Sequence, residues 1–131
     1  MVKPIIVTAA IIIKDKNVLL VKNKKCLQKS GYGFPGGIGG FEKSPDPAKA
    51  VIHEVKGDIG CEFNGSFFSY NFRNEDIPVI TLFFVGSIEG KPRPICKNII
   101  DVKYFSIAEA LAMDLIYDHS FILKKYLQNN N

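Results

Sequence analysis

A helix with both ends marked lies near the middle of the chain and constrains the fold more than any other feature. Asp46 is a favoured N-cap residue, and Pro47 suits the first helical position. Gly60 can adopt the left-handed conformation that ends a helix. Between them, apolar residues recur at three- and four-residue spacing, namely at Ala48, Val51, Ile52, Val55 and Ile59. The pattern predicts a helix over residues 46–59 with one apolar face.

Runs rich in β-branched and aromatic residues flank this helix and predict strands on both sides of it. The expected strands cover residues 5–13, 18–22, 62–72, 79–88 and 102–105, with a short extended piece at 31–34. Two helical segments are expected at 107–112 and 118–127, the first opened by a capping box of Ser106 and Glu109. This order indicates a mixed α/β layer fold in one domain over residues 1–131, with a frayed tail at 128–131.

The net charge argues against nucleic acid as a partner. A formal charge of +4 helps to attract a phosphate-bearing ligand but is small for a nucleic-acid surface. The basic cluster of Lys22, Lys24 and Lys25 contains no aromatic residue, and we interpret it as a solvated loop.

A membrane anchor and a disulfide framework are not expected either. The apolar run at residues 5–13 is too short to span a membrane, and the turn and second apolar run after it favour a strand over a signal peptide. The three cysteines, Cys26, Cys61 and Cys96, are odd in number and lack the spacing of a metal clip. We therefore expect free thiols and a cytoplasmic location.

Six of the 11 glycines fall between Gly31 and Gly40, directly before the central helix. Glycine allows close approach of the backbone, so such a run can direct backbone N–H and C=O groups at a phosphate or a metal. Taken alone, however, a glycine run usually forms only a turn. The function of this run therefore depends on the helix that follows.

That helix carries two carboxylates one turn apart. Glu54 and Asp58 are four residues apart and share one side of the helix, largely opposite the apolar face. Carboxylate oxygens are the ligands that Mg²⁺ and Mn²⁺ prefer. The alternative interpretation is a solvent-exposed acidic face without function.

Glycine run, capped helix and acidic pair together resemble the Nudix box. That family pattern is a glycine, five residues, a glutamate, seven residues, Arg-Glu, an aliphatic, any residue, two glutamates, any residue, a glycine and an aliphatic. With Gly60 as the closing glycine, residues 53–61 align with its Arg-Glu half, and Gly39 falls at its opening glycine. Residues 34–37 resemble the family's Pro-Gly-Gly start, and residues 18–22, 102–105 and 117–119 resemble further parts of the family.

The resemblance implies a Nudix-like α/β/α sandwich with a mixed sheet. It implies metal-dependent hydrolysis of the pyrophosphate bond in a nucleoside diphosphate linked to another group, with ADP-ribose-like substrates first and nucleoside triphosphates second. Mg²⁺ or Mn²⁺ is the expected cofactor. Because family members are often dimers, a homodimer is one expectation.

The resemblance also assigns roles to residues. Glu54 would bind metal and act as the catalytic base, and Asp58 would be a second metal ligand. The carbonyl of Gly37 would assist the metal. The substrate loop would be shaped by Gly36, Gly37, Gly39 and Gly40.

Three positions depart from the family pattern. Gly57 replaces one of the paired glutamates, so one metal ligand is missing. His53 stands at the position of the family arginine, and Pro45 stands at the position of the isolated glutamate. His53 is an auxiliary candidate for the site, as a proton carrier.

Family members often supply one further acid from a late loop, and the candidates for it here are Glu75, Asp76 and Asp101. His119 follows Asp118, which we interpret as a helix N-cap.

These departures leave two alternatives to the hydrolase open. One is a nucleotide-binding module that keeps the pocket without catalysis. The other is a domain whose sheet edge serves only a protein partner, which would bind no nucleotide.

Overall fold

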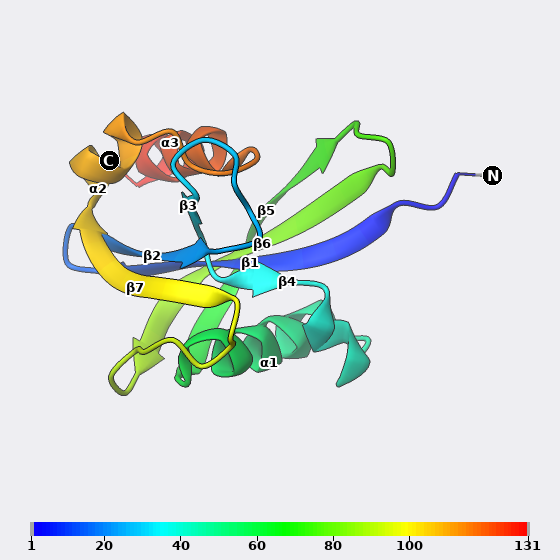
Figure 1. Cartoon of the computed structure of the whole chain (residues 1–131), viewed down its shortest axis with the longest axis horizontal. Helices are drawn as coiled ribbons and strands as arrows, with labels where there is room; N and C mark the ends of the chain where they lie inside the picture. The colour runs from blue at the N-terminus through cyan, green and yellow to red at the C-terminus, as the bar shows by residue number, and fades with distance from the viewer. Residues whose placement is uncertain (1, 131) are drawn as a thin grey trace.

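The computed structural model describes residues 2–130, and its centre is a mixed β-sheet of seven strands within that range (Figure 1). The main strand order is β3-β2-β1-β6-β5, with β4 pairing β1 and β7 pairing β2. The strands are β1 (Ile5–Lys14), β2 (Asn17–Asn23), β3 (Tyr32–Gly33), β4 (Gly36–Gly37), β5 (Glu62–Arg73), β6 (Val79–Glu89) and β7 (Ile99–Ser106). The helices are α1 (Pro47–Ile59), α2 (Ile107–Ala112) and α3 (His119–Asn129), with a 3-10 turn, η1 (Gly39–Glu42), before α1.

The sheet is mixed because β1 and β6 run parallel while the other pairs are antiparallel. The parallel pairing extends from Ile5 opposite Val79 to Ile12 opposite Gly86. A parallel pair needs a crossover connection, and α1 lies within the long segment between these two strands. The predicted mixed sheet is therefore confirmed.

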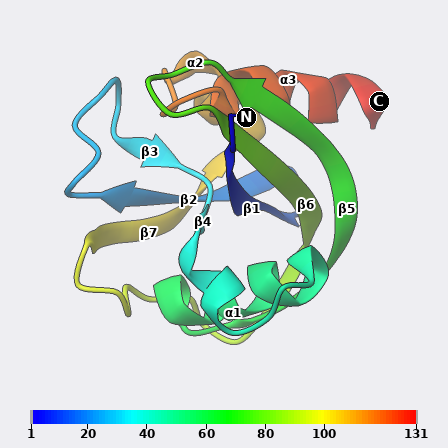
Figure 2. The same cartoon turned by 90° about the vertical axis from the view of Figure 1, so that its right-hand side faces the viewer.

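Helices cover both faces of the sheet, as Figure 2 shows, with α1 on one side and α2 and α3 on the other. Each face has its own apolar core. On the α1 face, Val51, Val55 and Ile59 pack with Ala10 and Ile12 of β1. On the opposite face, the alternate β1 residues pack with the α3 residues Ile122 and Leu123. The two-residue period of a strand thus divides β1 between two cores, which confirms the predicted α/β/α sandwich.

Helix α1 begins and ends as predicted. The side chain of Asp46 accepts a hydrogen bond from the Ala48 amide at 3.0 Å, and Gly60 has a φ of +75°. Two side chains differ from the expected pattern. Ala48 is exposed because the first turn extends beyond the sheet contact, whereas Asp58 is buried. The helix is therefore covered on its acidic side as well as on its apolar face.

Other boundaries differ modestly from the sequence predictions. The extended piece expected at 31–34 divides into β3 and β4, which pair with different strands. Helix α3 continues to Asn129, so residues 128 and 129 of the tail expected to fray are helical, and residue 131 lies outside the described range. Within that range, no helix is long and apolar enough to cross a membrane.

The capping predictions have mixed outcomes. Ser106 and Glu109 form the capping box of α2. Asp118 stands at the N-cap position of α3, but its side chain makes no capping bond. It accepts instead from the side-chain amide of Asn71 at 2.6 Å, because β5 passes beside this end of α3.

Replacement of Gly57 by alanine should stabilise the protein. A Cβ atom at Gly57 would meet no atom within 4 Å, and the residue is exposed inside α1. Glycine in such a position costs about 1 kcal/mol relative to alanine, so the free energy of unfolding in denaturant should rise by up to that amount. Gly40→Ala is the control with the opposite expected effect. Its Cβ would lie 2.1 Å from the Ala50 carbonyl oxygen, so this variant should have a lower free energy of unfolding. An unchanged or lower stability of Gly57→Ala would contradict this view of the helix.

Candidate functional site

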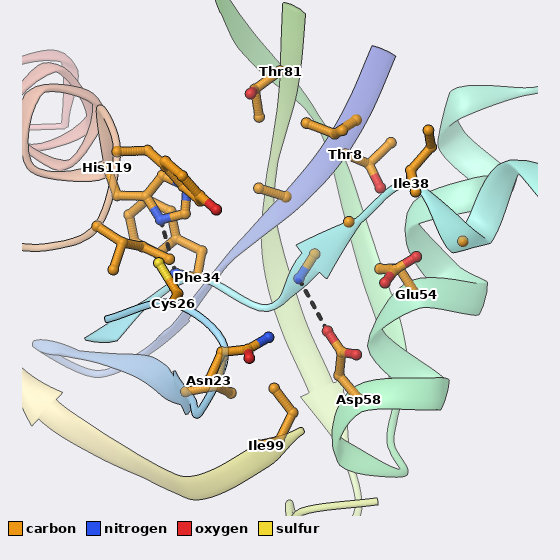
Figure 3. A pocket seen from close by; sticks show the side chains of 18 of the residues that line it. Thr8, Asn23, Cys26, Phe34, Ile38, Glu54, Asp58, Thr81, Ile99 and His119 are labelled. Atoms are coloured by element: carbon orange, nitrogen blue, oxygen red, sulfur yellow. Dashed lines mark hydrogen bonds between the residues drawn. The ribbon is translucent and has the colours of Figure 1, made fainter. Parts of the chain in front are cut away.

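A cavity of about 400 Å³ opens between the glycine segment, α1 and the ends of several strands (Figure 3). Thr8 of β1 and Thr81 of β6 contribute to its floor, and Glu54 and Asp58 line it from α1. His119 lines it from the opposite side. The sheet therefore brings together residues from both halves of the chain around one space.

Glu54 is fixed by the glycine segment. Its Oε2 atom accepts a hydrogen bond from the backbone amide of Gly40 at 2.7 Å. Burial raises the pKa of this carboxyl above its usual value, the Gly40 bond lowers it, and the charge of Glu42 raises it.

Asp58 is more deeply buried, with 8% of its surface exposed, and its Oδ2 atom accepts from the Gly36 amide at 3.1 Å. Burial and, second, the negative charge of Glu54 raise the pKa of Asp58 to about 7, against a smaller lowering by the Gly36 bond. The charge of Glu54 therefore acts on Asp58. An exposed acidic face without function, the alternative interpretation of this pair, does not describe Asp58.

Glycine is required where this segment touches its neighbours. A Cβ atom at Gly36 would lie 2.2 Å from the Thr8 carbonyl oxygen, and one at Gly37 would lie 2.7 Å from Oε1 of Glu54. Gly40 approaches the α1 backbone equally closely, whereas a Cβ at Gly39 would make only an ordinary contact of 3.5 Å. Side chains at these contacts would push the segment away from the carboxylates, so the glycines allow the amide bonds to Glu54 and Asp58.

The acidic pair fits a divalent cation. The ion pairs of residues 2–130 are Lys29–Asp114, Lys56–Glu62 and Arg73–Glu75, so neither Glu54 nor Asp58 has a cationic partner there. Two partly buried carboxylates without a counter-charge match the oxygen donors that Mg²⁺ takes while it keeps several waters. The described residues contain no group of three or more acidic, histidine or cysteine side chains arranged for a metal.

The remaining candidates from the sequence lie away from the cavity. His53 is exposed on α1, and Pro45 is exposed before it. Among the acids considered for a late loop, Glu75 pairs with Arg73, and Asp101 accepts a hydrogen bond from the Tyr32 hydroxyl. Neither these two nor Asp76 belongs to the described lining of the cavity.

The wall opposite the acids contains residues that the sequence analysis did not assign to the site. His119 is buried, and its Nδ1 atom accepts from the Phe34 amide at 3.1 Å. Its ring stacks on Phe34 with a centroid distance of 4.7 Å. Burial lowers the pKa of His119 to about 4, so the ring is neutral at pH 7.

Arg73, at the end of β5, completes this wall. The carbon of its guanidinium lies 3.9 Å from the ring centroid of Tyr117. The family resemblance included residues 117–119 without giving them a role in the site, and no local pattern marks Arg73. These residues meet only through the pairing of β5 with β6 and the return of the chain after β7. Arg73 and Tyr117 also line the cavity.

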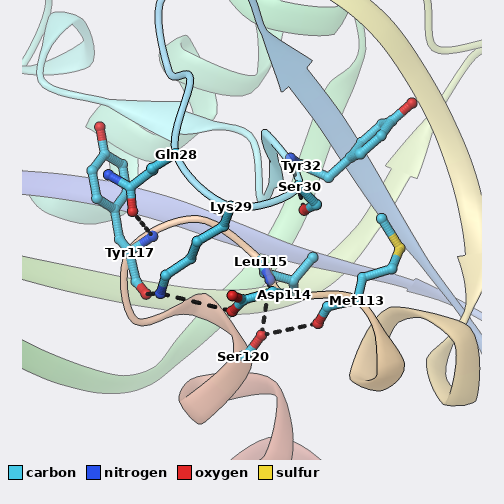
Figure 4. A network of polar contacts seen from close by, with 9 residues as sticks. All are labelled: Gln28, Lys29, Ser30, Tyr32, Met113, Asp114, Leu115, Tyr117 and Ser120. Atoms are coloured by element: carbon cyan, nitrogen blue, oxygen red, sulfur yellow. Dashed lines mark hydrogen bonds and ion pairs between the residues drawn. The ribbon is translucent and has the colours of Figure 1, made fainter.

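A network of polar contacts holds Tyr117 in place (Figure 4). Its backbone amide donates to the side chain of Gln28 at 3.1 Å, and its carbonyl accepts from the Lys29 ammonium at 2.6 Å. Tyr117 has a φ of +51°, which is uncommon for a residue with a side chain. The segment between β2 and β3 thus fixes the Tyr117 backbone beside the cavity.

Known structures share this architecture. The NUDIX domain of Shewanella oneidensis NrtR, in a cocrystal with ADP ribose, superposes with a TM-score of 0.85 at 16% identity, over 100% of this chain and 91% of that chain. A NUDIX hydrolase from Nitrosomonas europaea gives a TM-score of 0.81 at 19% identity, over 98% and 90% of the two chains. The E. coli ORF135 protein gives 0.80 at 21% identity, over 97% and 91%. At these identities, the similarity establishes a common fold.

The family itself follows from the sequence. No curated protein matches the chain. A family model described as the NUDIX domain, however, matches residues 4–128, which is nearly the whole chain. The chain therefore belongs to the NUDIX domain family.

Proposed function

We propose that the chain is a pyrophosphohydrolase of nucleotide-linked substrates that works with a divalent metal held by Glu54 and Asp58. The observation that carries this proposal is the acidic pair on α1, fixed by backbone amides and without a cationic partner in the described part of the chain. Mg²⁺ is the first metal to test and Mn²⁺ the second, since both take oxygen ligands.

In this proposal, Glu54 also acts as the base. The Gly40 amide holds Oε2, while Oε1 lies beside Gly37 and can take a proton from the attacking water. The Gly37 carbonyl is proposed as a further metal ligand, and Gly36, Gly39 and Gly40 shape the loop around the diphosphate. When bound, the metal supplies charge neutralisation at the diphosphate oxygens. His53 has no part in this scheme because it does not line the cavity.

Nucleoside diphosphates linked to a second group are the proposed substrates, with ADP-ribose-like compounds first and nucleoside triphosphates second. The ADP ribose bound to the NUDIX domain of S. oneidensis NrtR supports this order. The cavity also supports a nucleotide, because carboxylates line one side and Phe34, Ile116 and the Tyr117 ring line another. An apolar wall beside polar groups suits a base joined to a diphosphate.

A binding module without catalysis is the second candidate. The observation that favours it is the carboxylate pair itself, since Gly57 leaves two acids on α1 where the family pattern has three. This candidate shares the cavity and the ligand class with the hydrolase and differs only in turnover.

Turnover therefore separates the two candidates. We expect wild-type protein with Mg²⁺ to release mononucleotide from ADP-ribose or a nucleoside triphosphate, measured by chromatography of the products. Glu54→Gln should lower kcat by about 100-fold or more, because it removes the base and a metal ligand. His53→Gln is the matched control, since it changes an exposed neighbour in the same helix. If the wild type binds nucleotide without turnover, the hydrolase is excluded and the binding module is the remaining candidate.

Restoring a glutamate at position 57 should strengthen metal binding. The position is exposed, and a Cβ there meets nothing within 4 Å, so a longer side chain fits. A third carboxylate on the acidic side adds a ligand, and the Mg²⁺ concentration for half-maximal stabilisation in thermal unfolding should fall roughly tenfold. Gly57→Ala is the control for the gain in helix propensity. Equal Mg²⁺ dependence in both variants would count against a metal at this pair.

The pH dependence of the free energy of unfolding should show that His119 is buried in its neutral form. Its pKa is about 4 when folded, below its ordinary value of 6.5, so the unfolded chain binds a proton that the folded chain excludes between these pH values. This contribution to stability is complete above pH 6.5 and is lost as the pH falls to 4, by roughly 3 kcal/mol.

The matched comparison is between wild type and His119→Gln without metal, by denaturant unfolding at several pH values. Asp58 contributes with the opposite sign, because its pKa is raised when folded, but it is present in both proteins and cancels in the difference. The difference in unfolding free energy should shrink as the pH falls from 6.5 to 4. A difference that is constant with pH would mean that His119 is not buried in neutral form.

A further inference from the structure

The wall opposite the acidic pair presents hydrogen-bond donors that lack partners. The Nε and Nη1 atoms of Arg73 are buried and donate no hydrogen bond to any of the described residues. The side chain as a whole is 15% exposed and lines the cavity. A buried guanidinium with unfilled donors is unfavourable, and a ligand that brings acceptors removes that cost.

The position of Arg73 is fixed before any ligand arrives. The carbon of its guanidinium lies over the Tyr117 ring, 3.9 Å from the ring centroid. Gln28 and Lys29 in turn hold the Tyr117 backbone. Glu75 approaches Nη1 at 3.4 Å, but its side chain is 49% exposed, so it balances the charge only in part.

His119 adds a second donor on the same wall. Since Nδ1 accepts the Phe34 amide, the single proton of the neutral ring must be on Nε2. Burial keeps the pKa of His119 low, so this neutral form prevails at pH 7. His119, which lines the cavity, therefore carries one N–H donor, at Nε2, and no free acceptor on its ring.

The negatively charged acceptors of the cavity lie elsewhere. The carboxylates of Glu54 and Asp58 lie on the α1 side, across β4 from His119 (Figure 3). On the donor wall, which is the side of the cavity formed by Arg73 and His119, Phe34 and Ile116 add apolar surface. Thr81 on the floor carries a hydroxyl, which can donate or accept and so tolerates either kind of partner. A flat ring with acceptors at its edge suits this wall.

We propose that Arg73 and His119 select the base of the nucleotide, favouring guanine or uracil, whose edges carry carbonyl oxygens, over adenine or cytosine. This inference rests on the proposed function, because it assumes a nucleotide whose diphosphate faces α1. Arginine donors match the O6 and N7 acceptors of guanine. The amino group of adenine or cytosine would instead place a donor against donors and leave buried groups unpaired. Within the ADP-ribose-like class of the proposed function, the guanine counterpart is then a better ligand than ADP-ribose itself.

Equilibrium binding of nucleoside monophosphates tests this without requiring turnover. Dissociation constants of GMP, AMP, UMP and CMP with Mg²⁺, from NMR titration of wild-type protein, should favour GMP over AMP and UMP over CMP by about tenfold. Arg73→Met keeps an apolar stem but removes the donors, and it should reduce both ratios to about threefold or less. Arg93→Met is the matched control, because it changes the exposed arginine of the chain and should preserve both ratios.

Arg73→Gln distinguishes recognition from damage to the fold. A glutamine side chain offers one donor and one acceptor, the pair that matches N7 and the amino group of adenine. AMP should therefore bind this variant more tightly than it binds the wild type, a gain that partial unfolding cannot produce. Tighter or equal binding of AMP relative to GMP in the wild type would overturn the inference.

Two further outcomes have distinct meanings. Ribose 5-phosphate lacks a base, so its binding should be similar in wild type and Arg73→Met, and an equal loss for it and GMP would place a phosphate at Arg73 and overturn base selection. Binding of all four nucleotides without preference refutes this inference alone. Binding of none also overturns this inference, whereas the proposed function is decided separately by the release of mononucleotide from ADP-ribose or a nucleoside triphosphate.

Discussion

The contact of the glycine segment with α1 and β1 is the constraint on which the rest of the site depends. Two backbone amides, from Gly36 and Gly40, donate to the side chains of Asp58 and Glu54. They reach those carboxylates only because the backbone of the segment passes very close to the backbone of Thr8 on one side and of Ala50 on the other. A Cβ atom at Gly36 or Gly40 would not fit there. A side chain at either glycine would separate the layers, so the same contact joins helix to sheet and holds the acids.

Much of the fold could be predicted because its signals are local. The caps of α1 and the capping box of α2 lie within a few residues of the elements they start or end, and the apolar period of each strand is visible in its own sequence. The acidic pair was also predictable, since four residues in a helix make one turn. What the sequence could not indicate was the burial of Asp58. That burial comes from a segment 22 residues earlier that folds back over the helix.

The residues of the donor wall could be predicted from the sequence even less than the burial of Asp58. Arg73 ends an edge strand, and Tyr117 and His119 follow β7, so about 45 residues separate groups that lie in contact. Their meeting depends on the strand order β1-β6-β5 and on the return of α3 over the sheet. Asp118 illustrates the consequence. Its local sequence favours an N-cap, but the neighbouring strand offers Asn71, and the tertiary contact replaces the local one.

The cavity keeps opposite charges apart instead of pairing them. Glu54 and Asp58 have no cationic partner within salt-bridge distance in the described residues, and Arg73 has only a half-exposed glutamate. Direct pairing across the cavity would compensate both groups and close the space between them. Because the sheet holds the groups apart, the carboxylates lack a counter-charge and the Arg73 guanidinium lacks hydrogen-bond acceptors, and both conditions are unfavourable for buried groups. In the proposed function, a metal–nucleotide complex that brings a cation to one end and acceptors to the other removes both costs, so the uncompensated groups that weaken the fold also favour its binding.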